Sequence, residues 1–283
     1  MSTKTRRTYH RKRVRKPVIP ILFALLIALF CSGVIYMRLQ PKWVLRVYEA
    51  SDPRGRTYHS YDWDNLVIEG DRMRYEDEHY TSAQGIDVSS HQDEIDWEAV
   101  KEDGIEFVYI RAGYRGYTEG GLYEDPNFRG NMIGARQAGL KIGVYFFSQA
   151  VTEEEAVEEA EFMLKLLGDS RLDLPVAFDM EEPETGETGR TEILTKKEQT
   201  ASAIAFLNRV SLAGYDTIVY DSSGRFDDDY DLTALQGYKK WTARYGDRPD
   251  FPYAFEIWQY SESGNVAGIE GNADMDILFL PKH

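Results

Sequence analysis

Eight short apolar segments dominate the chain from residue 84 onward, and their spacing limits the folds that it can adopt. They span residues 85–88, 106–113, 142–147, 174–180, 217–222, 240–245, 255–260 and 275–280. Each is rich in β-branched or aromatic residues, which is typical of buried strands. The intervals between the early segments are long enough for helices, and strands that alternate with helices predict an α/β protein with parallel strands. Eight such strands predict a closed, TIM-like (β/α) barrel.

Helix signals occupy the first intervals and then fade. Three intervals begin with an N-cap pattern, either Asp before Pro or Thr with Glu three residues later, and end at Gly. They run from Asp125-Pro126 to Gly139, from Thr152 to Gly168 and from Thr195 to Gly214. After residue 222 the strands follow one another more closely, so we expect an incomplete helical ring. A flat, doubly wound sheet is the alternative, but no glycine-rich phosphate loop follows the first strand.

The N-terminal region contains one segment long enough to cross a membrane. Residues 18–37 carry no charge, which matches the roughly 20 residues that a transmembrane helix needs. The eight basic side chains of residues 1–16, with no acid among them, favour an N-terminus on the cytoplasmic side. We therefore expect a cytoplasmic tail (1–16), a single-pass transmembrane helix in the cell membrane (17–37) and an extracellular C-terminal domain. A cleaved signal peptide is the alternative, although its apolar region is usually only about 7–15 residues long.

Residues 38–83 separate this apolar span from the barrel. The stretch "NLVIEGDRMRYEDE" (65–78) contains two short alternating runs around Glu69-Gly70-Asp71, which predicts a hairpin. We expect a juxtamembrane stalk or a small β extension over residues 38–83, followed by the barrel domain over residues 84–283.

Charge and cysteine content exclude some classes of function. The net charge is −15, and beyond residue 16 the chain has 25 basic against 48 acidic residues. An acidic domain without a basic stripe argues against nucleic-acid binding, and the basic tail beside an apolar span is read as a topology signal. Cys31 is the single cysteine, so no intrachain disulfide can form and the outer domain has no cysteine nucleophile.

Carboxylates gather where the predicted strands end. In "LPVAFDMEEP" (174–183), a run suited to a buried strand leads into Asp179 and Glu181. Residues two apart on a strand face the same side, so this pair projects together, while Glu182 points away with Met180. In a barrel the loops after the strands form the site, and we expect the pair to face the barrel axis. Two close carboxylates cannot both ionise easily, and a protonated acid beside an ionised partner is what glycosidic bond cleavage requires.

The same pattern recurs at the first and last strands. Asp87 ends the first strand in "GIDVSSHQ", and Asp274 and Asp276 stand at the start of the last one. First and last strands are neighbours in a closed barrel, so we expect Asp87 and Asp274 to meet on one side of the opening, opposite Asp179 and Glu181.

Other interpretations of these acids stay open. A strand-end carboxylate is often a helix N-cap or a solvated loop residue. That interpretation fits Asp125, Asp173, the acidic run 227–231, Glu182 and Glu184. Asp87, Asp179 and Glu181 could instead bind Mg²⁺ or Ca²⁺ through their oxygens, with His91 beside them. A serine nucleophile is disfavoured, because the sequence has no strand–Gly-x-Ser-x-Gly–helix elbow.

Aromatic residues also cluster at the strand ends. They are Tyr145, Phe146, Phe147, Tyr220, Trp241, Tyr245, Trp258 and Tyr260. Most aromatic residues of a barrel belong to its core, but polar-tipped rings at the opening suit the apolar faces of sugar rings. We therefore expect part of this set to contact a glycan.

Together these motifs resemble glycoside hydrolase family 25, the lysozymes that act as N-acetylmuramidases on peptidoglycan. The resemblance rests on "GIDVSSHQ", "IDWEAVKEDGIEFVYIRAG", "AGLKIGVYFFSQA", "LPVAFDME", "WTARYG" and "WQYSESGNVAGIEGNADMD", in the family's order over about residues 84–280. Each fragment alone has little specificity, whereas the ordered set is highly specific. The resemblance implies an eight-stranded barrel with an incomplete helical ring and an acid-lined pocket.

The resemblance also implies roles for individual residues. Glu181 matches the general acid, Asp179 its partner carboxylate, Asp87 the acid of the first strand and Asp274 the acid near the last strand. The expected substrate-binding set is Tyr145, Phe146, Tyr220, Trp241, Tyr245, Trp258 and Gln259. Asp276 stands where the family's usual ending has Asn, which adds a titratable group.

The implied reaction is cleavage of the β-1,4 bond between N-acetylmuramic acid and N-acetylglucosamine. Glu181 would act as general acid and base, and Asp179 would assist the substrate's own N-acetyl group, a route that departs from the usual two-carboxylate scheme. No cofactor or metal is expected, and the expected partners are peptidoglycan glycan strands and a membrane. The alternatives are a non-catalytic module that binds cell-wall glycan and a metal-dependent hydrolase.

Overall fold

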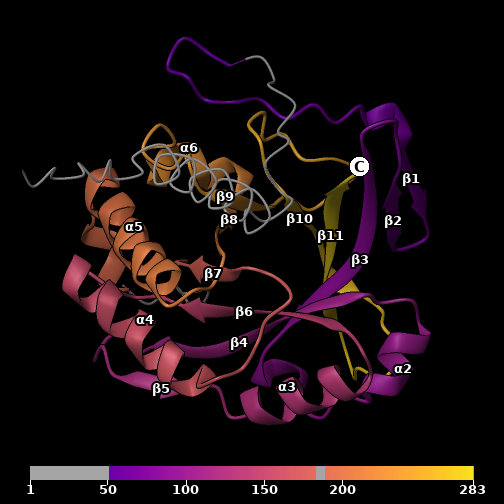
Figure 1. Cartoon of the computed structure of the whole chain (residues 1–283), viewed down its shortest axis with the longest axis horizontal. Coiled ribbons are helices and arrows are strands. Elements are labelled where there is room, and N and C mark those ends of the chain that lie inside the picture. Colours follow the sequence, from indigo (N-terminus) through magenta and orange to yellow (C-terminus); the bar gives the residue numbers. More distant parts are fainter. Residues whose placement is uncertain (1–50, 183–188, 283) are drawn as a thin grey trace, which may run out of the picture. The chain divides into compact units, whose positions relative to one another are not determined.

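The computed structural model describes residues 51–182 and 189–282, in which eight strands close into a barrel (Figure 1). The sheet order is β3-β11-β10-β9-β8-β7-β6-β4-β5, and β3 also pairs with β4, which closes the ring. The barrel strands are β3 (Tyr80–Val88), β4 (Phe107–Arg115), β6 (Lys141–Phe147), β7 (Val176–Asp179), β8 (Thr217–Ser222), β9 (Lys239–Ala243), β10 (Ile257–Gly264) and β11 (Ala273–Pro281). The short β5 (Leu122–Glu124) pairs with the end of β4 outside the ring. All eight predicted strands and the closed barrel are confirmed.

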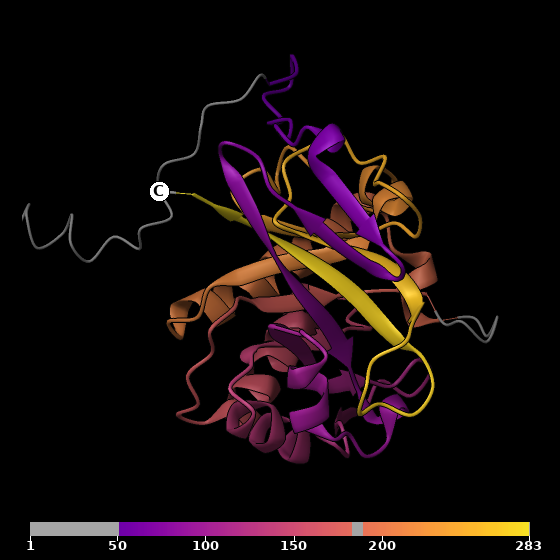
Figure 2. The same ribbon diagram turned by 90° about the vertical axis from the view of Figure 1, so that its right-hand side faces the viewer.

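The last strand, β11, runs against the others. Neighbouring pairs from β3 through β4 to β10 are parallel, but β11 is antiparallel to both β10 and β3, and Figure 2 shows it beside β3. The expectation of uniformly parallel strands is therefore wrong for β11. The physical reason is the connection from Gly264 to Ala273, which is too short for the crossover of a dozen or more residues that parallel neighbours need. Consequently β11 begins at the end of the barrel where the parallel strands finish, which we call the mouth.

Helices cover only part of the barrel, and the predicted incomplete ring is confirmed (Figure 1). They are α2 (Trp97–Glu102), α3 (Phe128–Gln137), α4 (Glu153–Leu167), α5 (Lys196–Leu212) and α6 (Ser223–Asp229), with short 3-10 helices η1 (Trp63–Asn65), η2 (Ser90–Gln92) and η3 (Arg190–Ile193). In the described part of the chain, no helix follows β9 or β10.

The three predicted helix starts differ in their capping. The α5 helix has the reciprocal capping box that Thr195 and Glu198 predict. At α4, Thr152 caps the helix, but the Glu155 carboxylate accepts a hydrogen bond from the main chain of Val151 instead. At α3 the helix starts at Phe128 and its N-cap makes no side-chain hydrogen bond. The Asp-Pro signal lies slightly upstream of the helix: Asp125 Oδ1 accepts a hydrogen bond from the Asn127 amide at 2.9 Å, while Asp125 Oδ2 is used in the site described below.

The segment before the barrel packs against it. The predicted hairpin is confirmed as β1 (Leu66–Glu69) and β2 (Arg72–Tyr75), and it lies outside β3 and β11, a part of the barrel that none of the described helices covers (Figures 1 and 2). The ring of Tyr61 stacks on that of Phe279 with centroids 4.1 Å apart. The first barrel strand, β3, starts at Tyr80, upstream of the expected boundary at residue 84. The expected domain division at 37 and 83 stays a prediction. The expected tail and transmembrane helix fall outside the described residues, and none of the described helices has the length and apolar character to cross a membrane.

Two layers of apolar side chains lie on either side of the barrel wall. The inner layer consists of Ala83, Phe107, Tyr109, Tyr145, Ala177, Ile218, Tyr220, Trp241, Ala243, Ile257 and Leu278. Alternate residues of the same strands, such as Val108 and Phe178, pack in the outer layer against the helices. Gly85 makes room for an inner ring, because a Cβ there would lie 2.2 Å from the ring of Phe107. This period of two decides which strand-end side chains point to the barrel axis.

Candidate active site

A cavity of about 500 Å³ opens at the mouth of the barrel, within the range of about 300–1,000 Å³ that is typical of small-molecule sites. Its lining residues are Asp87, Val88, Ser89, His91, Gln92, Arg111, Tyr117, Tyr145, Phe147, Asp179, Glu181, Glu182, Tyr220, Trp241, Tyr245, Gln259, Glu262 and Asp274. The four carboxylates that the sequence singled out as catalytic candidates therefore share one cavity.

Asp179 and Glu181 project from the end of β7. Asp179 is the last residue of the strand, on the inner face with Ala177, and it is buried. Its Oδ1 atom has no hydrogen-bond partner in the described part of the chain. Glu181 is half-buried. The main chain of both residues is held from the turn after β6: the Ser148 amide donates to the Asp179 carbonyl at 2.7 Å, and Gln149 Nε2 donates to the Glu181 carbonyl at 2.7 Å.

Asp87 and Asp274 meet across β3 and β11, as the closed barrel predicted. The two residues are paired in the strand register, because the antiparallel β11 brings its first residues to the mouth. Asp276, two residues further along, is fully buried and accepts a hydrogen bond from Trp241 Nε1 at 2.8 Å. Its Oδ2 atom has no partner among the described residues unless the carboxyl carries a proton.

A buried amide links the acids to two tyrosines. Gln259 Nε2 donates to Asp87 Oδ2 at 2.6 Å. Its Oε1 atom accepts hydrogen bonds from the hydroxyls of Tyr220 at 2.9 Å and Tyr245 at 3.3 Å. These contacts fix the orientation of the Gln259 amide, and hence which Asp87 oxygen receives a donor. The predicted residues Tyr145, Tyr220, Trp241, Tyr245 and Gln259 all line the cavity.

Burial makes the carboxyls at the mouth weak acids. It raises the pKa of Asp179 well above the ordinary value, and the nearby charge of Glu181 raises it further, while Arg111 opposes the shift. Burial and the charge of Asp274 likewise raise the pKa of Asp87, against the hydrogen bond from Gln259. For Asp276 the causes of the raised pKa are burial and then the charge of Asp87. Like charges this close do not all ionise easily, which is why the shifts of Asp87, Asp179 and Asp276 have the same direction.

Asp276 and Asp87 also influence each other's pKa values, in opposite directions. Their side-chain contact lowers the pKa of Asp87 and raises that of Asp276. A carboxyl that donates a hydrogen bond is held in its protonated form, and the acceptor is held ionised. The directions of the two shifts correspond to Asp276 as the donor and Asp87 as the acceptor of the pair.

Three predicted positions need correction. Glu182 lines the cavity instead of pointing away, because β7 ends at Asp179 and the alternation of faces ends with it. Phe146 faces outward and packs on the rings of Phe162 and Phe206. Trp258 also faces outward and donates through Nε1 to the Arg244 carbonyl. The same period of two that directs Tyr145 and Gln259 inward excludes these two rings from the cavity.

Asp125 is not the solvated residue that the sequence suggested, because it binds Arg111 in addition to the main-chain amides at the start of α3. It is 1% exposed, its Oδ2 atom lies 2.8 Å from Nε of Arg111, and it accepts a hydrogen bond from the Ser90 amide. Among the described residues that line the cavity, Arg111 is the only Arg or Lys. The sequence reasoning missed Arg111, although a charged residue on the inner face of the buried run "FVYIRAG" was a usable signal.

The other acids that were read as structural have mixed outcomes. Asp173 is exposed and accepts a hydrogen bond from the Ile142 amide, as a solvated loop residue can. Glu184 lies outside the described residues. Within residues 51–182 and 189–282, no group of three or more His, Cys, Asp or Glu side chains is arranged to hold a metal ion. The cation site suggested for Asp87, Asp179 and Glu181 therefore has no support from the geometry.

Known proteins of similar sequence and fold include lysozymes. A family model described as "Glycosyl hydrolases family 25" matches residues 86–269. The chain is 33% identical over 195 residues to "Autolytic lysozyme" of Clostridium acetobutylicum, covering 68% of this chain and 55% of that protein. It is also 33% identical over 207 residues to the uncharacterized protein YegX of Escherichia coli K12, covering 69% and 68%. The bacterial lysozyme structure from Streptomyces coelicolor is similar with a TM-score of 0.58 and 27% identity, covering 69% and 90%.

Proposed function

The chain belongs to glycosyl hydrolases family 25, and from this membership we propose that it is a peptidoglycan hydrolase that cleaves between N-acetylmuramic acid and N-acetylglucosamine. The observation that carries the proposal is the pair Asp179 and Glu181 at one strand end. They share a cavity, their main chain is fixed by Ser148 and Gln149, and the pKa of Asp179 is raised by burial and by Glu181.

Glu181 suits the role of general acid. It is half-buried in the cavity wall, so it can reach both a bound glycan and solvent. In the proposed reaction its proton passes to the glycosidic oxygen as the bond from that oxygen to the anomeric carbon breaks. Glu181 then accepts a proton from the water that attacks the anomeric carbon in the second half of the reaction.

Asp179 suits the role of assisting the substrate's N-acetyl group. In this step the acetamido oxygen bonds to the anomeric carbon while the leaving sugar departs, and positive charge develops on the acetamido group. A carboxylate with an unpaired oxygen in the same cavity can orient and stabilise that group. Burial and the charge of Glu181 raise the pKa of Asp179, and the charge of Arg111 opposes that shift; the positive charge that develops on the acetamido group favours the ionised carboxylate in the same way as Arg111.

Digestion of purified peptidoglycan by the full chain tests the activity. Mass spectrometry of the new reducing ends should find N-acetylmuramic acid, and Glu181→Gln should yield none. New N-acetylglucosamine ends would instead indicate the other class of glycosidase. Binding without cleavage would favour a glycan-binding module, and loss of cleavage in EDTA would favour a metal-dependent hydrolase.

We propose further that residues 17–37 anchor the chain in the cell membrane with residues 1–16 in the cytoplasm. The support comes from the uncharged run 18–37 and the eight basic residues before it. An anchored chain should remain in the membrane pellet after an alkaline wash, and protease added outside the cell should digest the barrel domain. N-terminal sequencing that begins after residue 33 would instead show a cleaved signal peptide.

A further inference from the structure

We propose that Gln149 is a positioning residue for Glu181 and that the buried carboxylate of Glu159 holds Gln149 in place. The inference rests on the proposed function, because it concerns the reaction in which Glu181 takes part. Gln149 does not line the cavity, so its effect on that reaction would act through Glu181 and not through the substrate.

Glu181 lies beyond the last paired residue of β7, and its main chain needs another support. The strand ends at Asp179, which is paired with Phe147 of β6 and Tyr220 of β8. Past this point the sheet no longer fixes the chain. The hydrogen bond from Gln149 Nε2 to the Glu181 carbonyl, at 2.7 Å, connects it to the turn after β6 instead.

The amide of Gln149 is held at both of its ends. Gln149 is fully buried, and its Oε1 atom accepts a hydrogen bond from Thr191 Oγ1 at 3.3 Å. Its own carbonyl accepts one from Arg190 at 3.1 Å. The side-chain amide therefore has a defined orientation, with its nitrogen toward Glu181, and η3 supports it from the opposite side.

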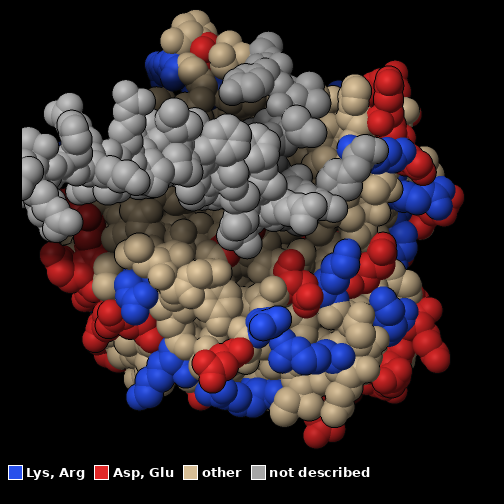
Figure 3. All heavy atoms as spheres, viewed as in Figure 1, with Lys and Arg blue, Asp and Glu red and all other residues tan. Residues whose placement is uncertain are grey.

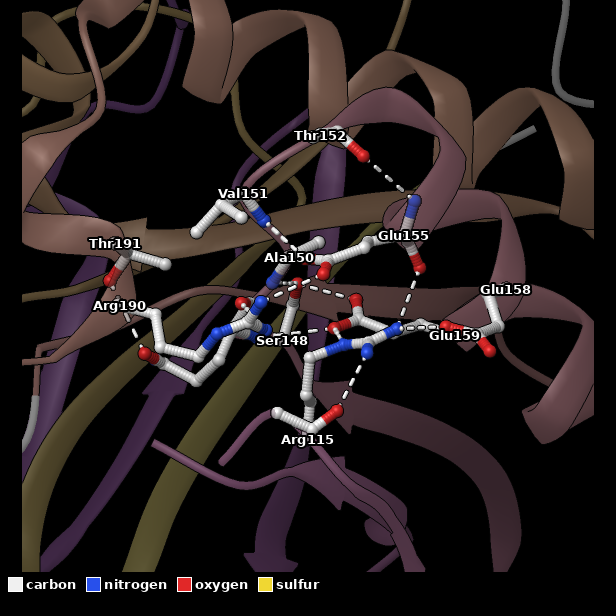
Figure 4. A network of polar contacts seen from close by, with 12 residues as sticks. Arg115, Ser148, Ala150, Val151, Thr152, Glu155, Glu158, Glu159, Arg190 and Thr191 are labelled. Carbon is white, nitrogen blue, oxygen red and sulfur yellow. Dashed lines mark hydrogen bonds and ion pairs between the residues drawn. The ribbon is translucent and has the colours of Figure 1, made fainter. Parts of the chain in front are cut away.

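Glu159 of α4 fixes the turn that carries Gln149 (Figure 4). Its Oε1 atom accepts hydrogen bonds from the main-chain N–H of Gln149 at 3.2 Å and from Arg115 Nε at 2.8 Å. Its Oε2 atom accepts one from Ser148 Oγ at 2.6 Å. Ser148 in turn donates through its main chain to the Asp179 carbonyl. One buried carboxylate thus holds the two consecutive residues that contact the main chain of both catalytic candidates.

A matched pair of substitutions in the full chain tests the role of Gln149. Gln149→Met keeps the length of the side chain but removes the donor to Glu181. We expect kcat on a soluble tetrasaccharide of alternating N-acetylglucosamine and N-acetylmuramic acid to fall about 10- to 100-fold, because small displacements of a catalytic group have effects of this size. KM should stay within about twofold, since substrate contacts are unchanged. The control is Gln199→Met, which alters another buried glutamine, on α5, and should leave kcat unchanged.

A milder substitution covers the case in which Gln149→Met does not fold. Thr191→Val removes only the hydroxyl that orients the Gln149 amide, and it should lower kcat a few-fold at constant KM. Unchanged kcat in whichever of these two variants folds would overturn the inference while leaving the proposed function intact. A parallel rise in KM would also overturn it, since Gln149 would then act on binding. A wild-type chain that does not cleave the tetrasaccharide overturns the proposed function and this inference with it.

Discussion

The buried carboxylate of Glu159 and the buried carboxylates at the mouth lie in the same barrel but differ in their hydrogen-bond partners. Glu159, between the barrel and α4, receives hydrogen bonds from three donors, one of them the ion-paired Arg115. At the mouth, Asp179 and Asp276 face other acids, and each has an oxygen that lacks a partner among the described residues when it is ionised. An unsatisfied buried polar atom costs roughly 1–3 kcal/mol. The comparison indicates that Glu159 stabilises the fold. The unpartnered carboxylates at the mouth instead lower stability, as is expected of groups that serve catalysis.

The largest expected effect is the loss of cleavage in Glu181→Gln. If the carboxylates at the mouth serve catalysis and not stability, kcat should fall about 1,000-fold, because general acid–base catalysis contributes a factor of about 10²–10⁴. The free energy of unfolding, measured with urea, should change by less than about 1 kcal/mol, as is usual for a partly exposed side chain. Near-normal cleavage by Glu181→Gln would contradict a catalytic role for the carboxylates at the mouth.

Arg115→Met should lower stability, in contrast to Glu181→Gln, because Arg115 is the ion-pair partner of Glu159. Removal of one partner of a buried ion pair leaves Glu159 without its compensating charge, so that it must either ionise unpaired or take up a proton, and the free energy of unfolding should fall by about 3 kcal/mol. The matched control is Arg129→Met, which breaks an exposed pair with Glu124 and should cost less than about 1 kcal/mol. Equal losses of stability in the two variants would contradict a structural role for Glu159.

Asp179→Asn should separate activity from stability. The amide keeps the shape of the side chain and removes a buried group that repels Glu181, so the free energy of unfolding should stay constant or rise by about 1 kcal/mol. Cleavage should nevertheless slow about 100-fold, because the neutral amide stabilises the developing charge poorly. Parallel loss of both quantities would mean that Asp179 is structural, as Glu159 is.

The smallest expected effect is a change of pH dependence in Asp276→Asn. The pKa values of Asp87, Asp179 and Asp276 are raised above the ordinary 3.8, so the folded state binds more protons than the unfolded state. Their contribution to stability is present below about pH 4 and is lost as pH rises toward the folded pKa values. These three groups by themselves lower the stability between pH 4 and pH 7, whereas His59, whose pKa burial lowers from 6.5 to about 4, raises it over the same interval. Asp276→Asn should gain about 1 kcal/mol over wild type at pH 7 and nothing at pH 4, as measured by urea unfolding at both values.

Glu159 adds to the same pH dependence from the structural side. Burial raises its pKa from 4.5 to about 7, although hydrogen bonds from Ser148 and Arg115 oppose the shift. Its favourable contribution is complete below about pH 4.5 and is lost as pH rises through about 7. Measuring Asp276→Asn against wild type cancels this part, so the difference between the two proteins reports on the mouth alone.

The barrel was predictable because its signals are local. Apolar runs, capping residues and glycines mark each element within a few positions, and ring closure then requires that the first and last strands meet. This requirement predicts that Asp87 lies beside Asp274, as the register of β3 and β11 confirms. The direction of β11 was not predictable from its own residues, since a pattern of period two is the same when read in either direction.

What escaped prediction depends on long-range pairing. Glu182 reaches the cavity because β7 stops pairing at Asp179, and the apolar pattern does not show where pairing stops. The sequence predicts only the helix-start contact of Asp125, because its second partner, Arg111, is brought to it by the fold. Gln149 gave no signal, since a glutamine after a strand is ordinary until its contact with Glu181 is seen.

The pairing of Pro281 with Tyr80 has a practical consequence for circular permutation of the chain and for insertion of the barrel into another protein. The first and last strands of the barrel end side by side, away from the cavity, so a flexible linker from Pro281 to residue 51 would keep the segment that packs on β3 and β11 while the chain is reopened elsewhere. A circular permutant that begins after α3 should keep the cleft unobstructed, and its rate of peptidoglycan cleavage would test this directly. For the same reason the barrel can be inserted into a loop of a host protein and held at both ends, with its open face toward the substrate.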